Sequence, residues 1–157
     1  MTEAIRQGDI PGVQLRCRAD LAAAPHAAWR LLTDPRGLER WLCEEAEMPA
    51  AAGGDFRWTG CAGLEPGTVE EGTILDLEAP RVVLARTRQP TWSAFTRLRI
   101  DLEPTADGCE ISVLQNGFEH LPLSLGLTVW ELYRRRWRAV LAALREIFRE
   151  SQRGESR

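Results

Sequence analysis

Residues 127–150 read LTVWELYRRRWRAVLAALREIFRE and predict a long amphipathic helix towards the end of the chain. Apolar side chains recur at i, i+3, i+4 and i+7, the spacing that places them on one face of a helix. The opposite face is rich in arginine. The apolar face comprises Trp130, Tyr133, Trp137, Val140, Leu141, Leu144, Ile147 and Phe148. The side chains expected in solvent are Arg134, Arg135, Arg136 and Arg138.

Strands and turns dominate the chain from about residue 44 to residue 116, and a first strand precedes them. Apolar and polar residues alternate with a period of two, which is typical of strands that bury one face. Asp107-Gly108 between two such runs predicts a hairpin. The expected strands are 13–20, 56–58, 68–77, 82–88, 92–102 and 111–116.

Two short helices are expected after the first strand. Pro25 suits a first helical turn, and the run 34–37 (DPRG) ends that helix. Leu38, Trp41 and Leu42 predict a second one. Consecutive strands with short turns form an antiparallel meander, whose apolar face the helices must cover. The chain therefore predicts an α+β helix-grip fold, in which a curved antiparallel sheet wraps around a long C-terminal helix and encloses space for a ligand.

Size and charge exclude several classes of function. A chain of 157 residues corresponds to one domain; we expect a flexible segment at 1–12, the helix-grip domain at 13–150 and a polar tail at 151–157. The net charge is -3, with arginine and acidic residues interspersed, so no nucleic acid partner is expected. No run approaches the ~18 apolar residues of a membrane span, so we expect no membrane insertion and a cytoplasmic protein.

The four cysteines, Cys17, Cys43, Cys61 and Cys109, are expected to be buried free thiols. They are far apart, with no C-x-x-C pair and no histidine at ligand spacing, so neither a zinc site nor a redox pair is indicated. The sequence also lacks a nucleophile elbow, a phosphate-binding glycine loop and a paired-carboxylate motif. We therefore expect no metal, no cofactor and no catalytic residue.

Several segments, taken in order, resemble one superfamily. Residues 25–35 (PHAAWRLLTDP), followed by Leu38 and Trp41, resemble the opening of START-like (SRPBCC) proteins, which include polyketide cyclases, lipid-transfer proteins and birch-pollen-allergen-like proteins. Residues 53–56 (GGDF) resemble the branch homologous to the activator of the heat-shock protein 90 ATPase. Further similar segments are 72–77 (GTILDL), 80–83 (PRVV), 107–113 (DGCEISV), 116–118 (NGF) and the helix around Trp137, Leu141 and Leu144.

The resemblance implies the helix-grip fold and a ligand cavity. Relatives bind lipids, hormones or polyketides, a few are cyclases, and one group binds enediyne toxins in the organisms that make them. Cys109 stands where the family usually has threonine, and Gln115 stands where it often has histidine. Because that histidine would be the titratable group of the last strand, its loss favours binding over catalysis.

Aromatic residues are the main candidates for a ligand-binding wall, because flat rings give large apolar contacts and stack on planar ligands. Tyr133, the only tyrosine, either orients a ligand oxygen or bonds a backbone carbonyl. Gln115 either offers its amide to a ligand or caps a strand end. Trp29 is expected in the core. The expected ligand-binding residues are Trp41, Phe56, Trp58, Trp92, Phe95, Gln115, Phe118, Trp130, Tyr133 and Trp137.

Arginines on the predicted strands are expected to pair across the sheet. Arg86, Arg88, Arg97 and Arg99 lie on adjacent strands, and Glu70 or Asp101 would be their partners. An arginine turned inward would instead bind an anionic head group, although a buried unpaired charge is costly.

The predicted function is binding of a hydrophobic, lipid-like or polycyclic polyketide-like molecule in an internal cavity, for transport, sequestration or self-resistance. One alternative is a polyketide cyclase or dehydratase, in which Tyr133 and a nearby acid or amide would handle protons. A second alternative is an activator of a chaperone ATPase that acts by surface contact. The identity of the ligand and the formation of a homodimer are left open.

Overall fold

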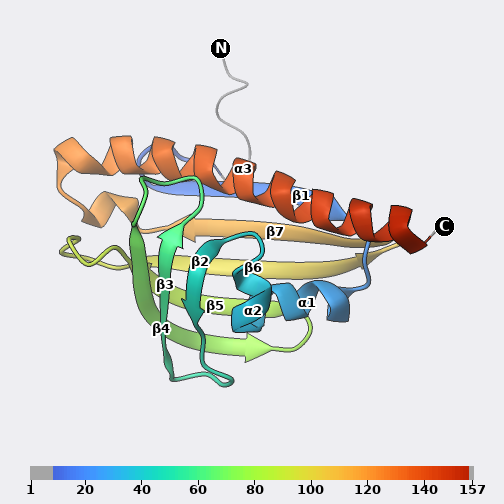
Figure 1. Cartoon of the computed structure of the whole chain (residues 1–157). Coiled ribbons are helices and arrows are strands. Elements are labelled where there is room, and N and C mark those ends of the chain that lie inside the picture. The colour runs from blue at the N-terminus through green and yellow to red at the C-terminus, as the bar shows by residue number, and fades with distance from the viewer. Residues whose placement is uncertain (1–8, 156–157) are drawn as a thin grey trace, which may run out of the picture.

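The computed structural model describes residues 9–155 and arranges them as the periodicities predict (Figure 1). Residues 1–8 and 156–157, from the predicted flexible segment and polar tail, lie outside the described residues. In chain order the elements are β1 (Gln14–Leu21), α1 (Pro25–Thr33), α2 (Pro35–Leu38), β2 (Cys43–Glu47), β3 (Asp55–Cys61), β4 (Val69–Glu78), β5 (Val82–Arg88), β6 (Thr96–Thr105), β7 (Gly108–Asn116), the 3-10 turn η2 (Phe118–His120) and α3 (Leu123–Glu155).

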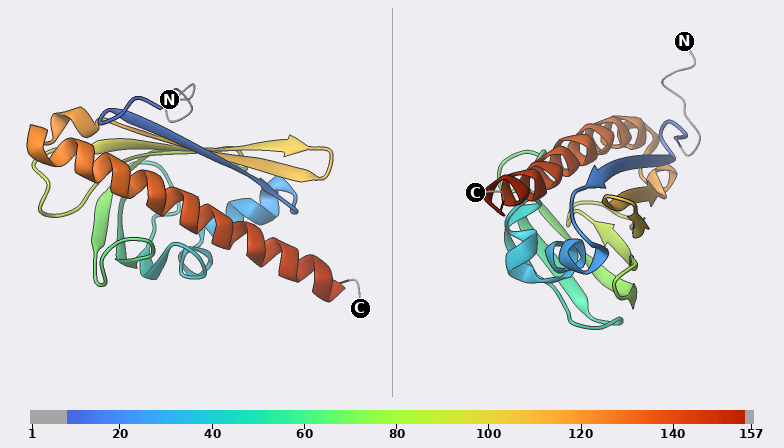
Figure 2. Two further views of the ribbon diagram at one scale, coloured as in Figure 1. Left: turned by 90° about the horizontal axis from the view of Figure 1, so that it is seen from above. Right: turned by 90° about the vertical axis from the view of Figure 1, so that its right-hand side faces the viewer.

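The strands form one antiparallel sheet in the order β1-β7-β6-β5-β4-β3-β2, which leaves β1 and β2 at the edges. The sheet curves around α3, and α1 and α2 lie beside it (Figures 1 and 2). This arrangement confirms the helix-grip fold. Within the described residues, no helix combines the length and the apolarity needed to cross a membrane.

Alternation along the central strands builds the core between the sheet and α3. In β7 every second residue from Cys109 to Gln115 is buried, and the residues between them are partly exposed. Leu98, Ile100 and Leu102 alternate in the same way on β6. The predicted buried face of α3 packs against these side chains, as the period of 3.6 requires.

Several boundaries differ from those predicted, most of all in β6 and α3. β6 begins at Thr96 rather than at residue 92, because Trp92 lies in a turn where its N–H donates to the carbonyl of Gln89 at 2.9 Å. α3 begins just after Pro122, whose carbonyl accepts the N–H groups of Leu125 and Gly126. The helix also continues to Glu155, so residues 151–155 of the predicted tail are helical.

β2 and α2 also differ from the prediction, because the sequence pattern is weak in both segments. β2 has the sequence CEEAE and is an edge strand with one buried residue, so it lacks the alternation that reveals a strand. α2 ends at Leu38, and Trp41 lies in the turn beyond it. Asp34 caps α2 by accepting the N–H of Arg36 at 3.1 Å, which explains why the chain restarts a helix directly after α1.

Gly72 is required where β4 lies against β5. A Cβ atom at this position would overlap the backbone carbonyl oxygen of Arg86 and lie 2.9 Å from Cε1 of Phe56. We expect Gly72→Ala to lower the free energy of unfolding by at least about 2 kcal/mol, because backbone atoms must move to relieve the overlap. Urea unfolding measures this, with Thr73→Ala as the matched control at the next position. Equal stability of the two variants would contradict the close approach.

Candidate functional site

A buried ion pair joins β4 to α3 inside the curve of the sheet. Glu70 lies opposite Trp58 in the β3–β4 register, and its side chain is 2% exposed. Nη1 of Arg136 lies 3.2 Å from Oε2 of Glu70, and Nη2 donates to Oε1, so the contact is bidentate. The Arg136 side chain has no exposed surface. Both charges are therefore held away from water and satisfy each other.

The position of Arg136 corrects the prediction that it faces solvent. Arg136 lies next to Trp137 and three residues after Tyr133, at the border of the apolar face of α3. Because the sheet curves around the helix, a wider arc of α3 is buried than the apolar stripe alone indicates. The expectation that Glu70 pairs with an arginine of a neighbouring strand was also wrong, since its partner comes from α3.

Tyr133 on α3 extends this ion pair into a hydrogen-bond network that includes Glu70 on β4 and Gln89 just after β5. Its hydroxyl donates to Oε2 of Glu70 at 3.0 Å and accepts from Nε2 of Gln89 at 3.1 Å. The hydroxyl thus bonds a carboxylate, which neither sequence interpretation named. Burial, followed by the charge of Glu70, raises the pKa of Tyr133 well above its ordinary value. At neutral pH the group is a hydrogen-bond donor and no base.

Gln115 anchors a second line of hydrogen bonds across the sheet. Its Oε1 accepts the indole N–H of Trp137 at 2.8 Å, and its Nε2 donates to the hydroxyl of Thr96 at 2.9 Å. That hydroxyl donates in turn to the carbonyl of Thr87. Gln115 is the penultimate residue of β7, as expected, but it is fully buried, and its side chain orients Trp137 instead of capping the strand.

Aromatic rings surround Tyr133 and Trp58. Trp92 lies 5.4 Å and Phe118 lies 5.9 Å from the ring of Tyr133, while Phe56 and Trp58 pack together at 4.5 Å. Distances of this size are typical of favourable aromatic pairs. The predicted set that the structure gathers in the interior is Phe56, Trp58, Trp92, Gln115, Phe118, Tyr133 and Trp137.

Three predicted ligand-binding residues take no part in these networks. Trp41 and Trp130 are buried in the core, but each indole N–H already donates to a backbone carbonyl, that of Leu31 for Trp41 and that of Gln14 for Trp130. Phe95 is half-buried under the guanidinium groups of Arg86 and Arg88, at 4.5 and 4.6 Å. Trp29 is partly buried against the core, as expected.

The interior is closely packed, and it contains polar atoms without partners. Phe118, Tyr133 and Trp137 have 0% exposed surface, so no space for a water molecule adjoins these rings. Among the described residues, Nε1 of Trp58, Nε of Arg136 and Oγ1 of Thr87 are buried without a hydrogen bond. Each such group costs about 1–3 kcal/mol. The site therefore has excess hydrogen-bond donors beside aromatic rings.

The described residues give little support for thiol chemistry or for a metal site. All four cysteines are buried free thiols, as predicted. Burial raises the pKa of Cys43 to about 12, and it raises the pKa values of the other three thiols as well. They are therefore protonated and inert at neutral pH. No group of three or more His, Cys, Asp or Glu residues is arranged to hold a metal ion there.

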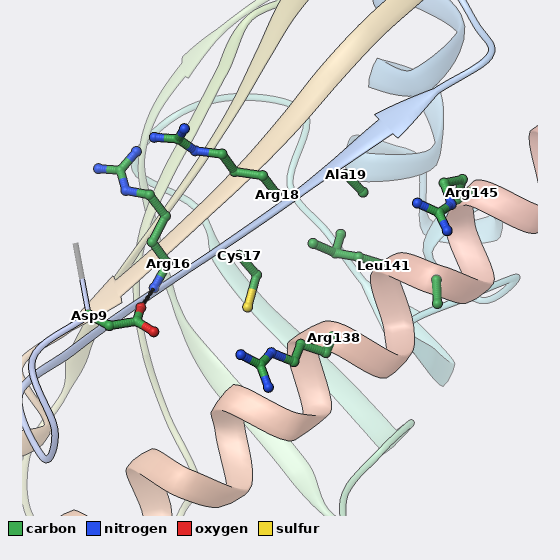
Figure 3. A pocket seen from close by; sticks show the side chains of 9 residues that line it. Asp9, Arg16, Cys17, Arg18, Ala19, Arg138, Leu141 and Arg145 are labelled. Carbon is green, nitrogen blue, oxygen red and sulfur yellow. Dashed lines mark hydrogen bonds between the residues drawn. The ribbon is translucent and has the colours of Figure 1, made fainter. Parts of the chain in front are cut away.

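Open grooves are found at the surface. The groove in Figure 3 has a volume of about 530 Å³ and runs between β1 and α3, past Cys17, Arg138 and Leu141. A groove of about 440 Å³ lies beside Trp41, Cys61 and Ala143. The cavity expected from the sequence is thus occupied by side chains at the ring positions described above. The groove beside β1 has mainly polar walls, and the one beside Trp41 has mainly apolar walls.

Comparisons with known proteins agree with this architecture. Residues 22–149 match the family described as Activator of Hsp90 ATPase homolog 1-like protein. The fold is similar to protein MLL2253 from Mesorhizobium loti, with a TM-score of 0.73, 18% identity, and coverage of 87% of this chain and 97% of that one. No curated protein matches the chain.

Two other solved structures share the fold. The Aha1 dimer from Colwellia psychrerythraea has a TM-score of 0.71 and 14% identity, over 87% of this chain and 96% of that one. DynU16, from the dynemicin biosynthetic locus, has a TM-score of 0.70 and 16% identity, over 85% of this chain and 46% of that one. At these identities the likeness shows the fold alone.

Breaking the ion pair should be costly, and replacing both partners should not. We expect Arg136→Met to lower the free energy of unfolding by about 3–5 kcal/mol, because Glu70 is left buried and unpaired. The double variant Arg136→Met, Glu70→Leu should recover most of this loss. Urea unfolding of both variants, with the exposed Arg135→Met as control, measures the coupling. A loss no larger than that of Arg135→Met would contradict the buried pair.

Tyr133 should not ionise in the folded protein near pH 10. Its raised pKa means that the full stabilisation is present below the unfolded pKa of about 10 and is lost as pH rises towards the folded value. Because the chain has a single tyrosine, the increase in absorbance at 295 nm on tyrosinate formation comes from this group, above the absorbance of the six tryptophans, which the Tyr133→Phe variant measures. We expect the absorbance to rise only together with unfolding seen by circular dichroism. Ionisation near pH 10 in a folded protein would show that the hydroxyl is accessible.

Proposed function

The chain belongs to the family of Activator of Hsp90 ATPase homolog 1-like proteins, and from this premise we propose that it binds a small hydrophobic molecule inside the grip without catalysis. The ligand is mainly apolar and planar, and it carries an acceptor oxygen. One observation supports the proposal above others: buried donors at Trp58 and Arg136 lack partners beside the Glu70 carboxylate and a group of aromatic rings.

Stability alone does not explain the polar groups of the interior. Replacing a buried ion pair by well-packed apolar residues is often neutral or stabilising, so Glu70 and Arg136 are not needed for a core. The unpaired donors add a further cost. An acceptor oxygen on a ligand would satisfy the N–H of Trp58 or Nε of Arg136 and remove that cost.

The rings define the rest of the ligand. Phe56 and Trp58 on one side and Trp92, Phe118 and Tyr133 on the other offer flat apolar surfaces. Such surfaces favour a polycyclic or long-chain compound over a sugar or a nucleotide. Lipids and polyketides have this chemistry, and DynU16 comes from the dynemicin biosynthetic locus. Transport, sequestration or self-resistance would each use binding of this kind.

Trp92 is the side chain that a ligand would displace first. It lies outside the strands, in the turn 89–95, where its side chain packs against the ring of Tyr133 and its backbone bonds Gln89 and Arg88. A turn moves more easily than a strand paired on both sides. We infer that the ligand enters at this end of the sheet and takes the place of the Trp92 indole.

Catalysis is the weaker reading of the same residues. The Tyr133 hydroxyl donates to Glu70, and its raised pKa makes it a donor, so it cannot act as the base of a cyclase or dehydratase. The Glu70 carboxylate is itself bound by Arg136 and Tyr133. Activation of a chaperone ATPase is the second candidate, because the matched family carries that description. A change in the ATPase rate of a heat-shock protein 90 on addition of this chain would favour it.

The proposal is tested by tryptophan emission during titration with oleic acid, a sterol and an anthraquinone carboxylic acid. We expect saturable quenching by at least one of them. Trp58→Phe keeps a ring and removes the N–H, so it should weaken that binding about fivefold, the effect of one hydrogen bond.

Trp29→Phe is the matched control, since Trp29 packs against the core from α1 and should leave the affinity unchanged. A flat response to all three compounds would refute the interior site and leave ATPase activation as the function to measure. The homodimer remains a prediction, which sedimentation of the same samples examines.

A further inference from the structure

The groove between β1 and α3 combines an open strand edge with a row of arginines (Figure 3). β1 is the terminal strand of the sheet, and within residues 9–155 its outer edge pairs with no other strand beyond a single bridge between Ile10 and Gln14 at its start. Cys17 and Leu141 form the floor, while Arg138 and Arg145 approach from α3. The ligand site proposed above lies inside the sheet, and this groove is independent of it.

The backbone of β1 presents hydrogen-bonding groups to the groove at every second residue. Residues of an antiparallel pair alternately bond their partner strand and point away from it. The N–H of Arg16 points away from β7, because it donates to Oδ1 of Asp9 at 2.8 Å. The unbroken β1–β7 register therefore directs the N–H and the carbonyl of Arg18 to the same open edge.

Asp9 shows how this groove holds a carboxylate. One oxygen accepts the edge N–H of Arg16, and the other lies 3.5 Å from Nε of Arg134 on α3. Asp9 is 6% exposed, so the contact is buried within the chain. A carboxylate bound jointly by the strand edge and by a helix arginine is thus already present at one end of the groove.

The same arrangement repeats further along without a carboxylate. β1 and α3 run in the same direction here, because Cys17 lies by the carbonyl of Arg134 and Leu21 lines a groove with Arg145 and Arg149. Arg138 follows Arg134 by one turn, about 6 Å, and alternate residues of a strand are about 6.8 Å apart. Arg138 is exposed and makes no ion pair among the described residues.

We propose that this groove binds an extended acidic segment of another protein. The segment adds as a strand to the open edge of β1, and two carboxylates on its side towards α3 bind Arg138 and Arg145, whose backbones are about 10.5 Å apart along the helix. Backbone hydrogen bonds supply affinity in this mode, and the side chains supply specificity. The adjoining groove of about 410 Å³ is lined by Asp20 and Asp107 as well as by Arg149, so the acidic segment ends near Arg145.

Charge complementarity favours this occupant over two others. A second copy paired through β1 would bring the arginines of both α3 helices towards one another, and like charges across an interface oppose association. Nucleic acid would match the arginines, but it has no peptide groups to pair with the edge of β1. An acidic strand satisfies both features of the groove.

The test uses fluorescence anisotropy with a labelled peptide of alternating Val and Asp, seven residues long, and the full chain. We expect saturable binding that weakens at least about tenfold in the double variant Arg138→Gln, Arg145→Gln, because two charge-assisted contacts are lost. The matched control is Arg135→Gln, Arg97→Gln. It removes the same charge from exposed positions outside the groove and should bind within about twofold of the parent.

Two further peptides separate strand addition from simple attraction. Replacing Asp by Asn should abolish binding, and so should N-methylation of alternate peptide bonds, which removes the donors that pair with β1. Binding by the N-methylated peptide as tight as by the parent would show attraction by charge alone and overturn the proposal. Equal weakening in both double variants, or no saturable binding up to about 1 mM, would overturn it as well.

Discussion

The ion pair between Glu70 and Arg136 is the constraint around which the interior is organised. It joins the long helix to a strand in the middle of the curved sheet, in a place where neither charge contacts water. The Arg136 guanidinium also lies 4.5 Å from the ring of Trp137, and Glu70 receives the hydroxyl of Tyr133. Because each group needs the others to remain satisfied, the rotation of α3 against the sheet is fixed within narrow limits.

This constraint divides the interior into two halves of different character. At one end of the sheet, Ile100, Leu102 and Ile111 form an ordinary apolar core under α3. At the other end, Glu70 and Gln115 organise polar networks among aromatic rings. The first half supplies stability through burial, and the second adds unpaired donors and buried charges that stability does not require. This difference is the physical basis for placing the ligand at the second end.

α3 takes part in both proposed sites, because one of its faces is enclosed by the sheet and another lies along the edge of β1. The side of α3 that carries Tyr133, Arg136 and Trp137 is enclosed by the sheet. The side that carries Arg138 and Arg145 lies along the open edge of β1 and forms the wall of a groove. A small ligand and an acidic strand would therefore bind to separate faces of α3. The two sites share this helix but no residues.

The sequence by itself determined the order of elements, the fold class and the apolar face of α3, because periods of 2 and 3.6 report local geometry directly. The buried cysteines and the hairpin at Asp107-Gly108 followed from similarly local signals. Tyr133 and Trp58 were chosen from their chemistry, and the structure places them in one interior with Trp92. Only the tertiary structure decided that Arg136 is buried, that Glu70 is its partner 66 residues away, and that Gln115 orients Trp137. The sequence also could not show that Trp41, Trp130 and Phe95 make contacts outside the networks of Tyr133 and Gln115. Periodicity tells which face of an element is apolar, but the width of the buried arc and the pairing of distant residues depend on how strongly the sheet curves around the helix.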